Sequence, residues 1–307
     1  MVAAAVLVAA AAAPASAERP RSGWTTAWAT APAAAIPDTE QGYAGYTIRN
    51  VVHTTAGGSS VRVHLSNRFG TQPVLMGHVT VAVSAHGGGR RDGTIETSDG
   101  TAAAGTLRDV LFHGRGSITV PARADVVSDP VPLAVPADRD LLVTTWTPQP
   151  SGPVTYHPAA MQDSVFTRGP DDHAGDEAGT AFTETTRVWH YVNGVDVGGG
   201  PGTVVALGDS TTDSFKSLQG ANRRWTDYLA ARLADSPVPD YGIANSGISG
   251  NRLLLDGGVD GGAPNSTGYD RFGPSAQAFT FKARFPQPDQ AGPPLDMQPD
   301  PWCMGRA

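Results

Sequence analysis

Short runs of alternating apolar and polar residues extend from Trp24 to about Val197. Alternation with a period of two turns one face of a strand toward a core and the other toward water. No convincing amphipathic helix interrupts this region, and many short strands at such spacing favour a β-sandwich or jelly-roll. The pattern is clearest at residues 61–65, 79–83, 118–120 and 141–143. Between runs, Ala56-Gly57-Gly58-Ser59 predicts a hairpin turn, since glycine tolerates positive φ.

The polar positions of these runs carry most of the histidines. Six of the eight lie between His53 and His157, so the pattern predicts surface histidines. No pair has the close spacing of a metal site next to a carboxylate ligand, and no metal or other cofactor is expected. The region also holds five large aromatic residues that could belong to the core or could bind a glycan: Trp24, Trp28, Trp146, Tyr156 and Trp189.

The pattern changes at the glycine-rich segment 198–202, which predicts a linker or a tight crossover. Residues 203–207 then form a continuous apolar run, typical of a strand buried on both faces. A turn with Ser210 follows, and after it comes a helix with Trp225, Leu229 and Leu233 on one stripe. A second short strand leads into a loop at residues 245–252. This order predicts the start of a doubly wound α/β sheet, in which ligands bind at the carboxyl ends of the strands.

Ser210 sits at such a strand end, in Gly208-Asp209-Ser210. Alone, this tripeptide is a weak signal, because similar tripeptides are frequent in turns. A phosphate-binding loop is excluded by the lack of a following Gly-Lys-Ser/Thr. The Gly-x-Ser-x-Gly elbow is excluded because Thr212 stands where its second glycine would be.

Longer segments resemble the GDSL/SGNH hydrolases, in particular secreted actinobacterial serine esterases with a β domain in front. The two hydrolase blocks are Ala206-Leu-Gly-Asp-Ser-Thr-Thr-Asp213, with Ala221-Asn-Arg-Arg-Trp225 after it, and Ala244-Asn-Ser-Gly-Ile-Ser-Gly-Asn-Arg-Leu-Leu254. Upstream, residues 51–54, 61–70, 155–158 and 194–197 resemble the same subgroup. The resemblance covers about residues 24–276 and implies a flavodoxin-like α/β domain.

This resemblance implies roles for individual residues. Ser210 would be the nucleophile and would also donate an oxyanion-hole N–H, and Gly250 would be the second oxyanion donor. Four more residues match the two blocks and would support the site: Gly208, Asp209, Asp213 and Asn251. Ser214 departs from the glycine that the family usually has there.

The family's later blocks are missing from the sequence. No Asn is followed by Asp, and the last histidine is His190, so neither the Gly-x-Asn-Asp block nor the Asp-x-x-His block is present. A histidine for Ser210 would have to come from the β domain, as His157 or His190. We expect a partial hydrolase domain at 203–276, C-terminally truncated or frameshifted, and a disordered or out-of-frame tail at 277–307.

The N-terminus and the overall charge indicate where the protein acts. Residues 1–17 form an Ala-rich apolar run that ends in Ala-Ser-Ala, which predicts a signal peptide and secretion, with no membrane span. The net charge of −7 argues against nucleic acid as a partner. The sequence therefore predicts a secreted ester hydrolase for small-molecule or glycan esters, inactive in this form for lack of its base. The alternative is a non-catalytic protein whose β domain, residues 24–197, binds a glycan or cell-wall polymer.

Overall fold

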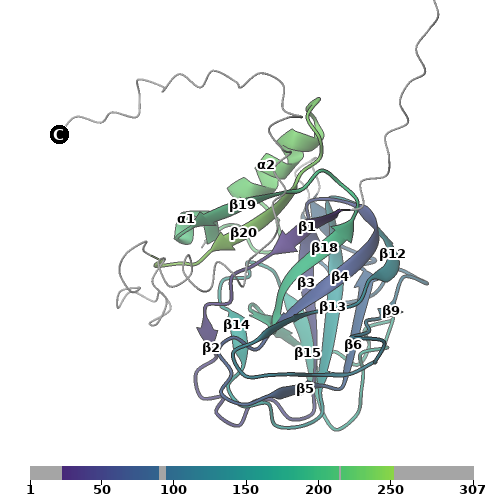
Figure 1. The fold of residues 1–307 in the computed structure, drawn as a ribbon, viewed down its shortest axis with the longest axis vertical. Helices are drawn as coiled ribbons and strands as arrows, with labels where there is room; N and C mark the ends of the chain where they lie inside the picture. The colour runs from purple at the N-terminus through teal and green to yellow at the C-terminus, as the bar shows by residue number, and fades with distance from the viewer. Residues whose placement is uncertain (1–22, 90–94, 214–215, 252–307) are drawn as a thin grey trace, which may run out of the picture.

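The computed structural model describes residues 23–89, 95–213 and 216–251 (Figure 1). The N-terminal region is mostly β, in several antiparallel sheets, and it is called the β region below. One large sheet has the order β1 (Trp24–Ala29), β18 (Val192–Gly198), β4 (Gly58–Ser66) and β11 (Asp125–Val127), with β12 (Val131–Val135) also paired to β4. The other has the order β16 (Glu184–Thr186), β15 (Ser164–Arg168), β3 (Tyr46–Thr54), β13 (Arg139–Thr147), β6 (His78–Val83) and β9 (Arg108–Asp109).

Smaller sheets close the ends of this region. They pair β10 (Ile118–Val120) with β5 (Val74–Met76), β7 (Gly88–Gly89) with β8 (Ile95–Glu96), and β14 (Thr155–His157) with both β17 (Trp189–His190) and β2 (Ala34–Ala35). The two large sheets share one apolar core, to which Val63 of β4, Val81 of β6 and Leu141 of β13 contribute. The inward positions of the alternating runs are therefore where the sequence predicts them.

The outward positions of the six-stranded sheet differ from the expectation of solvent exposure. Val51, Ala82 and Leu142 point away from the main core and still form a second buried cluster, with Ala102. Arg49, on the same face, is fully buried and donates to the carbonyl oxygens of two loop residues, Gly100 and Asp176. Loops cover this face of the sheet, so its central strands are buried on both sides.

The predicted hairpin at residues 56–59 is wrong. β3 and β4 flank this segment but lie in different sheets, so the turn carries the chain from one sheet to the other. Gly57 and Gly58 are absent from the residues with positive φ. A Cβ on Gly57 would lie 2.8 Å from the Val135 carbonyl oxygen, and one on Gly58 would lie 2.7 Å from that of Gly198. Close backbone approach, rather than turn conformation, requires these glycines.

Residues 203–251 form a second, smaller layer, called the α/β unit below. Strand β19 (Thr203–Gly208) pairs in parallel with β20 (Gly242–Gly247), and helices α1 (Ser210–Asp213) and α2 (Trp225–Ala234) lie between them in sequence. Figure 1 shows this unit in green against the end of the β region that carries β1. The Thr26 amide donates to Thr203 Oγ1, and the Ile243 amide donates to Thr55 Oγ1, both at 2.8 Å. These bonds fix β19 and β20 against the β region.

Two expectations about the α/β unit are wrong. The run 203–207 is not buried on both faces, since Val204, Val205 and Leu207 are exposed and only Ala206 is buried. Among the described residues β19 pairs with β20 alone, and the exposed Val204 and Val205 lie on opposite faces of the strand. The helix after Ser210 is present, but Trp225 at the start of its predicted stripe is exposed.

Neither described helix is long and apolar enough to cross a lipid bilayer. The predicted signal peptide, Ser214 and the predicted tail lie outside the described residues.

Candidate functional site

Ser210 and Gly250 lie on neighbouring loops of the α/β unit. Ser210 follows β19 and Gly250 follows β20, so both stand at the carboxyl end of the parallel pair. The two loops are joined directly, because the Ile248 amide donates to the Gly208 carbonyl oxygen at 3.1 Å. In the described part of the chain, neither the Ser210 nor the Gly250 backbone N–H donates a hydrogen bond. Gly250 has φ of +77°, a conformation that favours glycine. Two unpaired amide donors thus stand beside one partly exposed serine hydroxyl.

The supporting residues shape these loops. Gly208 packs so closely against Thr212 that an added Cβ would lie 2.2 Å from Thr212 Oγ1. The Asp209 carbonyl oxygen accepts from the Asp213 amide at 2.9 Å, which forms the single turn of α1. Asn251 Nδ2 donates to the Gly208 carbonyl oxygen at 3.4 Å, a second link between the loops.

Asp213 connects the site to the β region. Its Oδ1 lies 2.9 Å from Nε2 of His157, and its Oδ2 accepts from both the amide and the hydroxyl of Ser249. The Asp213 side chain is 3% exposed and that of His157 is 2% exposed. Burial alone would raise the pKa of Asp213, but the charge and hydrogen bond of His157 and the two bonds from Ser249 lower it. Asp213 is therefore a buried acid with two Ser249 donors against one oxygen and a ring nitrogen of His157 against the other.

Neither candidate histidine contacts Ser210. His157 is occupied by Asp213, and its Nδ1 donates to the Ala31 carbonyl oxygen at 2.8 Å. His190 is buried in the β region, where burial lowers its pKa to about 4. Within the described residues no group is hydrogen-bonded to Ser210 Oγ. The prediction of surface histidines is wrong for His53 and His157, because packing of the second layer and the loops covers them.

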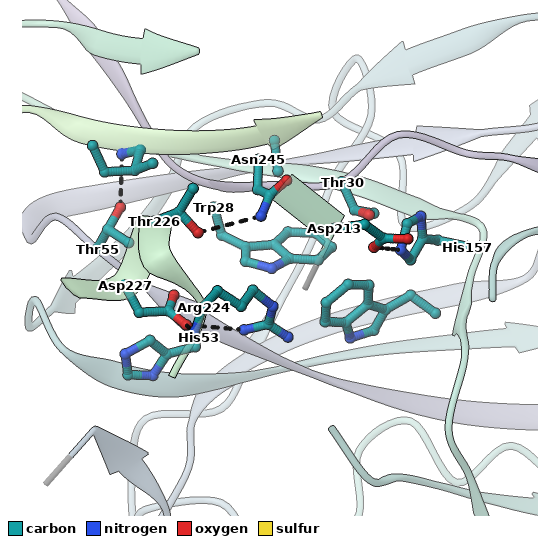
Figure 2. Close-up of a pocket in the computed structure, with 13 residues that line it drawn as sticks. Trp28, Thr30, His53, Thr55, His157, Asp213, Arg224, Thr226, Asp227 and Asn245 are labelled. Carbon is teal, nitrogen blue, oxygen red and sulfur yellow. Dashed lines mark hydrogen bonds and ion pairs between the residues drawn. The ribbon is translucent and has the colours of Figure 1, made fainter. Parts of the chain in front are cut away.

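A small cavity lies at the seam between the β region and the α/β unit (Figure 2). Its volume is about 20 Å³, enough for about one water molecule. Arg224, next to α2, is buried there, donates to the Ala160 carbonyl oxygen, and packs its guanidinium 5.5 Å from the Trp189 ring centroid. Asn245 of β20 donates to the Thr212 carbonyl oxygen at 2.7 Å.

The aromatic residues proposed for glycan binding are mostly unavailable. Trp28 and Trp189 are 6% and 4% exposed, with their rings edge to face in the core. The partly buried Trp24 has one ring face covered by the Arg62 guanidinium, 4.0 Å from its centroid. Among the described side chains, no group of three or more His, Cys, Asp or Glu has the arrangement of a metal site.

The parallel strands, the serine at a strand end and the neighbouring glycine loop agree with a comparison of the sequence against known families. A GDSL-like lipase/acylhydrolase domain occupies residues 204–289. The GDSL-like domain thus begins in β19 and includes Ser210, Asp213 and Gly250. No curated protein sequence matches the chain.

Sequence reasoning named His157 as a possible partner of Ser210 and missed its contact with Asp213. His157 belongs to the segment Thr155-Tyr-His-Pro158, which the resemblance contains but for which the alternation predicts a surface position. Its contact with Asp213 spans 56 residues of sequence, and no local pattern signals it. The start of α2 has a local signal, because Asp227 stands three residues after Arg224 and its Oδ2 accepts from the Arg224 amide at 2.7 Å.

Proposed function

We propose that the chain carries the nucleophile of a serine esterase that cleaves carboxylic esters, with Ser210 as that nucleophile. The observation that supports this most is the pair of unpaired backbone N–H groups at Ser210 and Gly250, on adjacent loops of the GDSL-like domain. Such donors stabilise the negative oxygen that develops when a hydroxyl attacks an acyl carbon. On this proposal, β19 and β20 are the first strands of a flavodoxin-like sheet of the SGNH type, behind a β-sandwich.

The chemistry follows the acyl-enzyme route. Ser210 Oγ gives up its proton to water or a soluble base as it bonds to the ester carbon, and the carbonyl oxygen becomes an oxyanion held by the Ser210 and Gly250 amides. The bond to the alkoxide then breaks, the alkoxide takes up a proton and leaves as the alcohol, and an acyl-serine remains. Water hydrolyses the acyl-serine to the acid and free Ser210. We propose small acyl esters, including acetylated glycans, as substrates, and export as the setting, supported by the Ala-rich residues 1–17.

Attack by Ser210 requires a general base that accepts the proton of its hydroxyl group. A positioned general base contributes about 10²–10⁴-fold to such a reaction. In the described residues none contacts the hydroxyl, and the sequence has no histidine after His190. We therefore propose that the chain acylates slowly, and that a base supplied from outside accelerates it.

Hydrolysis of p-nitrophenyl acetate tests this, with and without imidazole as a soluble base. The rate of the wild type above that of Ser210→Ala should be small in plain buffer and should rise with imidazole. Mass spectrometry should then find the acetyl group on Ser210. Ser117→Ala is the matched control, because Ser117 is exposed in the β region, and it should behave like the wild type. Equal rates for the wild type and Ser210→Ala in both buffers, with no acetylated Ser210, would reject the esterase.

A further inference from the structure

The imidazole of His157 has a hydrogen-bond acceptor against each ring nitrogen. Nδ1 lies 2.8 Å from the Ala31 carbonyl oxygen, and Nε2 lies 2.9 Å from Asp213 Oδ1. A carbonyl oxygen only accepts, so Nδ1 carries a proton. Two arrangements then remain for the other side of the ring. Either Nε2 also carries a proton and faces an ionised Asp213, or a neutral ring accepts a proton from a protonated Asp213.

The hydrogen bonds from Ser249 to Asp213 decide which of these two protonation arrangements is present. Asp213 Oδ2 accepts from the Ser249 amide at 2.8 Å and from the Ser249 hydroxyl at 2.7 Å. Two donors to one oxygen of a carboxyl group favour its ionised form. An ionised, buried Asp213 in turn needs a positive partner, because an unpaired buried charge is costly. The ring of His157 is therefore a donor at both nitrogens, as an imidazolium.

This pair joins the two loops of the candidate site. Asp213 is the last residue of the single-turn helix α1 that begins with Ser210, and Ser249 immediately precedes Gly250. The contact is tight, since a Cβ on Gly247 would lie 2.2 Å from the Asp213 amide nitrogen. Figure 2 shows His157 reaching Asp213 from the β region, at one edge of the seam.

Neighbouring side chains pack around His157 and its partners. The Trp189 ring lies 5.5 Å from the His157 ring, and the Arg224 guanidinium packs on Trp189 as well. Ala31, the other partner of His157, is buried in a small apolar cluster with Ile248 of the Gly250 loop. The histidine is thus held on the β-region side, and among the described residues its hydrogen bond to the hydrolase loops goes to Asp213.

We propose that His157 is a positioning residue for the hydrolase site, acting as a buried imidazolium that fixes Asp213 and, through Ser249, sets Gly250 opposite Ser210. The inference rests on the proposed function for its catalytic meaning. It gives the β region a part in building the oxyanion site, which differs from an independent glycan-binding role. It assigns no proton transfer to His157, because His157 does not contact Ser210.

The protonation of His157 can be observed without any enzymatic activity. In the full chain labelled with ¹⁵N-histidine, NMR at neutral pH should show His157 with protons on both ring nitrogens, assigned by their loss in His157→Phe. In Asp213→Asn the Nε2 proton signal should shift or disappear. A wild-type ring with one proton, on Nδ1 alone, would overturn the proposal, and His157→Gln provides the same assignment if His157→Phe does not fold.

The coupling to the loops has its own readout. His157→Phe and Asp213→Asn should both move the backbone amide resonances of Ser249 and Gly250. His78→Gln is the matched control, because His78 also bridges two carboxylates, Asp109 and Asp172, but on β6. It should leave those amides in place. Unmoved Ser249 and Gly250 amides in Asp213→Asn would contradict the positioning role.

Kinetics separate this proposal from the esterase proposal. Where the wild type shows cleavage that depends on Ser210, His157→Phe should lower kcat by about tenfold to a hundredfold with little change in KM, as expected for misplaced catalytic groups. His157→Gln, which keeps one donor toward Asp213, should recover part of kcat. An unchanged kcat in His157→Phe would overturn the positioning role. Without cleavage that depends on Ser210 the esterase proposal fails, and the NMR results alone decide the state of His157.

Discussion

At the scale of single residues, the pKa values of two buried histidines of the β region are shifted in opposite directions. Burial lowers the pKa of His190 to about 4, and its Nδ1 has no hydrogen-bond partner among the described residues. Burial also acts to lower the pKa of His53, but hydrogen bonds to Asp138 and Asp140 outweigh it and raise the value to about 9. A partner carboxylate, more than depth, decides the charge of a buried histidine.

His190 should make the protein sensitive to acid. Its pKa in the folded state is below the value of about 6.5 expected when unfolded, so the unfolded chain binds the proton more tightly. The stability linked to His190 is complete above about pH 6.5 and is lost as the pH falls toward 4, by on the order of 3 kcal/mol. Urea unfolding at a series of pH values should show this slope, and His190→Asn should flatten it. An equal slope in the variant would assign the acid sensitivity to other groups.

Sequence patterns found the residues of the site that lie within short blocks. Ser210 and Gly250 follow two strands by fixed spacings, so the pattern places them at one sheet edge, as the structure has them. The contact of His157 with Asp213 could not be predicted from the sequence, because it depends on how two layers of the molecule pack. The inward residues of the β strands were predictable from alternation, but the burial of their outward neighbours depends on loops with no periodic signal.

At the scale of elements, β20 shows how closely the α/β unit sits on the β region. Gly242, its first residue, would place a Cβ 2.1 Å from the Thr26 carbonyl oxygen of β1. No L-residue fits this position unless one of the two backbones moves. Strand β19 is packed less closely than β20. Its apolar sequence predicts a covered strand, but Val204, Val205 and Leu207 are exposed.

Gly242→Ala should therefore weaken the contact between β20 and β1. Inserting an atom into a filled space costs about 1–3 kcal/mol, and the unfolding free energy should fall by that amount. Gly116→Ala is the control, since a Cβ there meets nothing within 4 Å, and its effect should stay within about 0.5 kcal/mol. Urea denaturation of both variants makes the comparison. A Gly242→Ala protein as stable as the control would mean that β20 can shift on β1 at little cost.

At the scale of the whole molecule, polar side chains at the seam hold the two layers together. His53 is one of them, because Asn222, which precedes α2, donates to the same Asp140 oxygen that His53 contacts. Arg224 adds its bond to the Ala160 carbonyl oxygen, and His157 adds its pair with Asp213. The seam thus depends on charged groups whose state changes with pH.

The free energy of unfolding should fall at alkaline pH as His53 loses its proton. Its pKa in the folded state is above that of the unfolded chain, so its contribution is complete below about pH 6.5 and is lost as the pH rises toward 9. The loss should be on the order of 3 kcal/mol for a shift of this size. Thermal unfolding between pH 6.5 and 9 measures it, with His53→Gln expected to show a flatter profile. His86→Gln, at an exposed histidine, should keep the wild-type profile, and an identical profile for His53→Gln would contradict the assignment.

The pairing of His157 with Asp213 has a consequence for how such proteins can be recombined. Either residue of the pair would destabilise the fold without the other, because His157 alone would be a buried cation and Asp213 alone a buried anion. A chimaera that joins this β region to a foreign hydrolase domain would inherit one half alone. Successful exchange would therefore require both partners to be transplanted together, so the boundary for swapping modules runs around the pair and not through the glycines at 198–202.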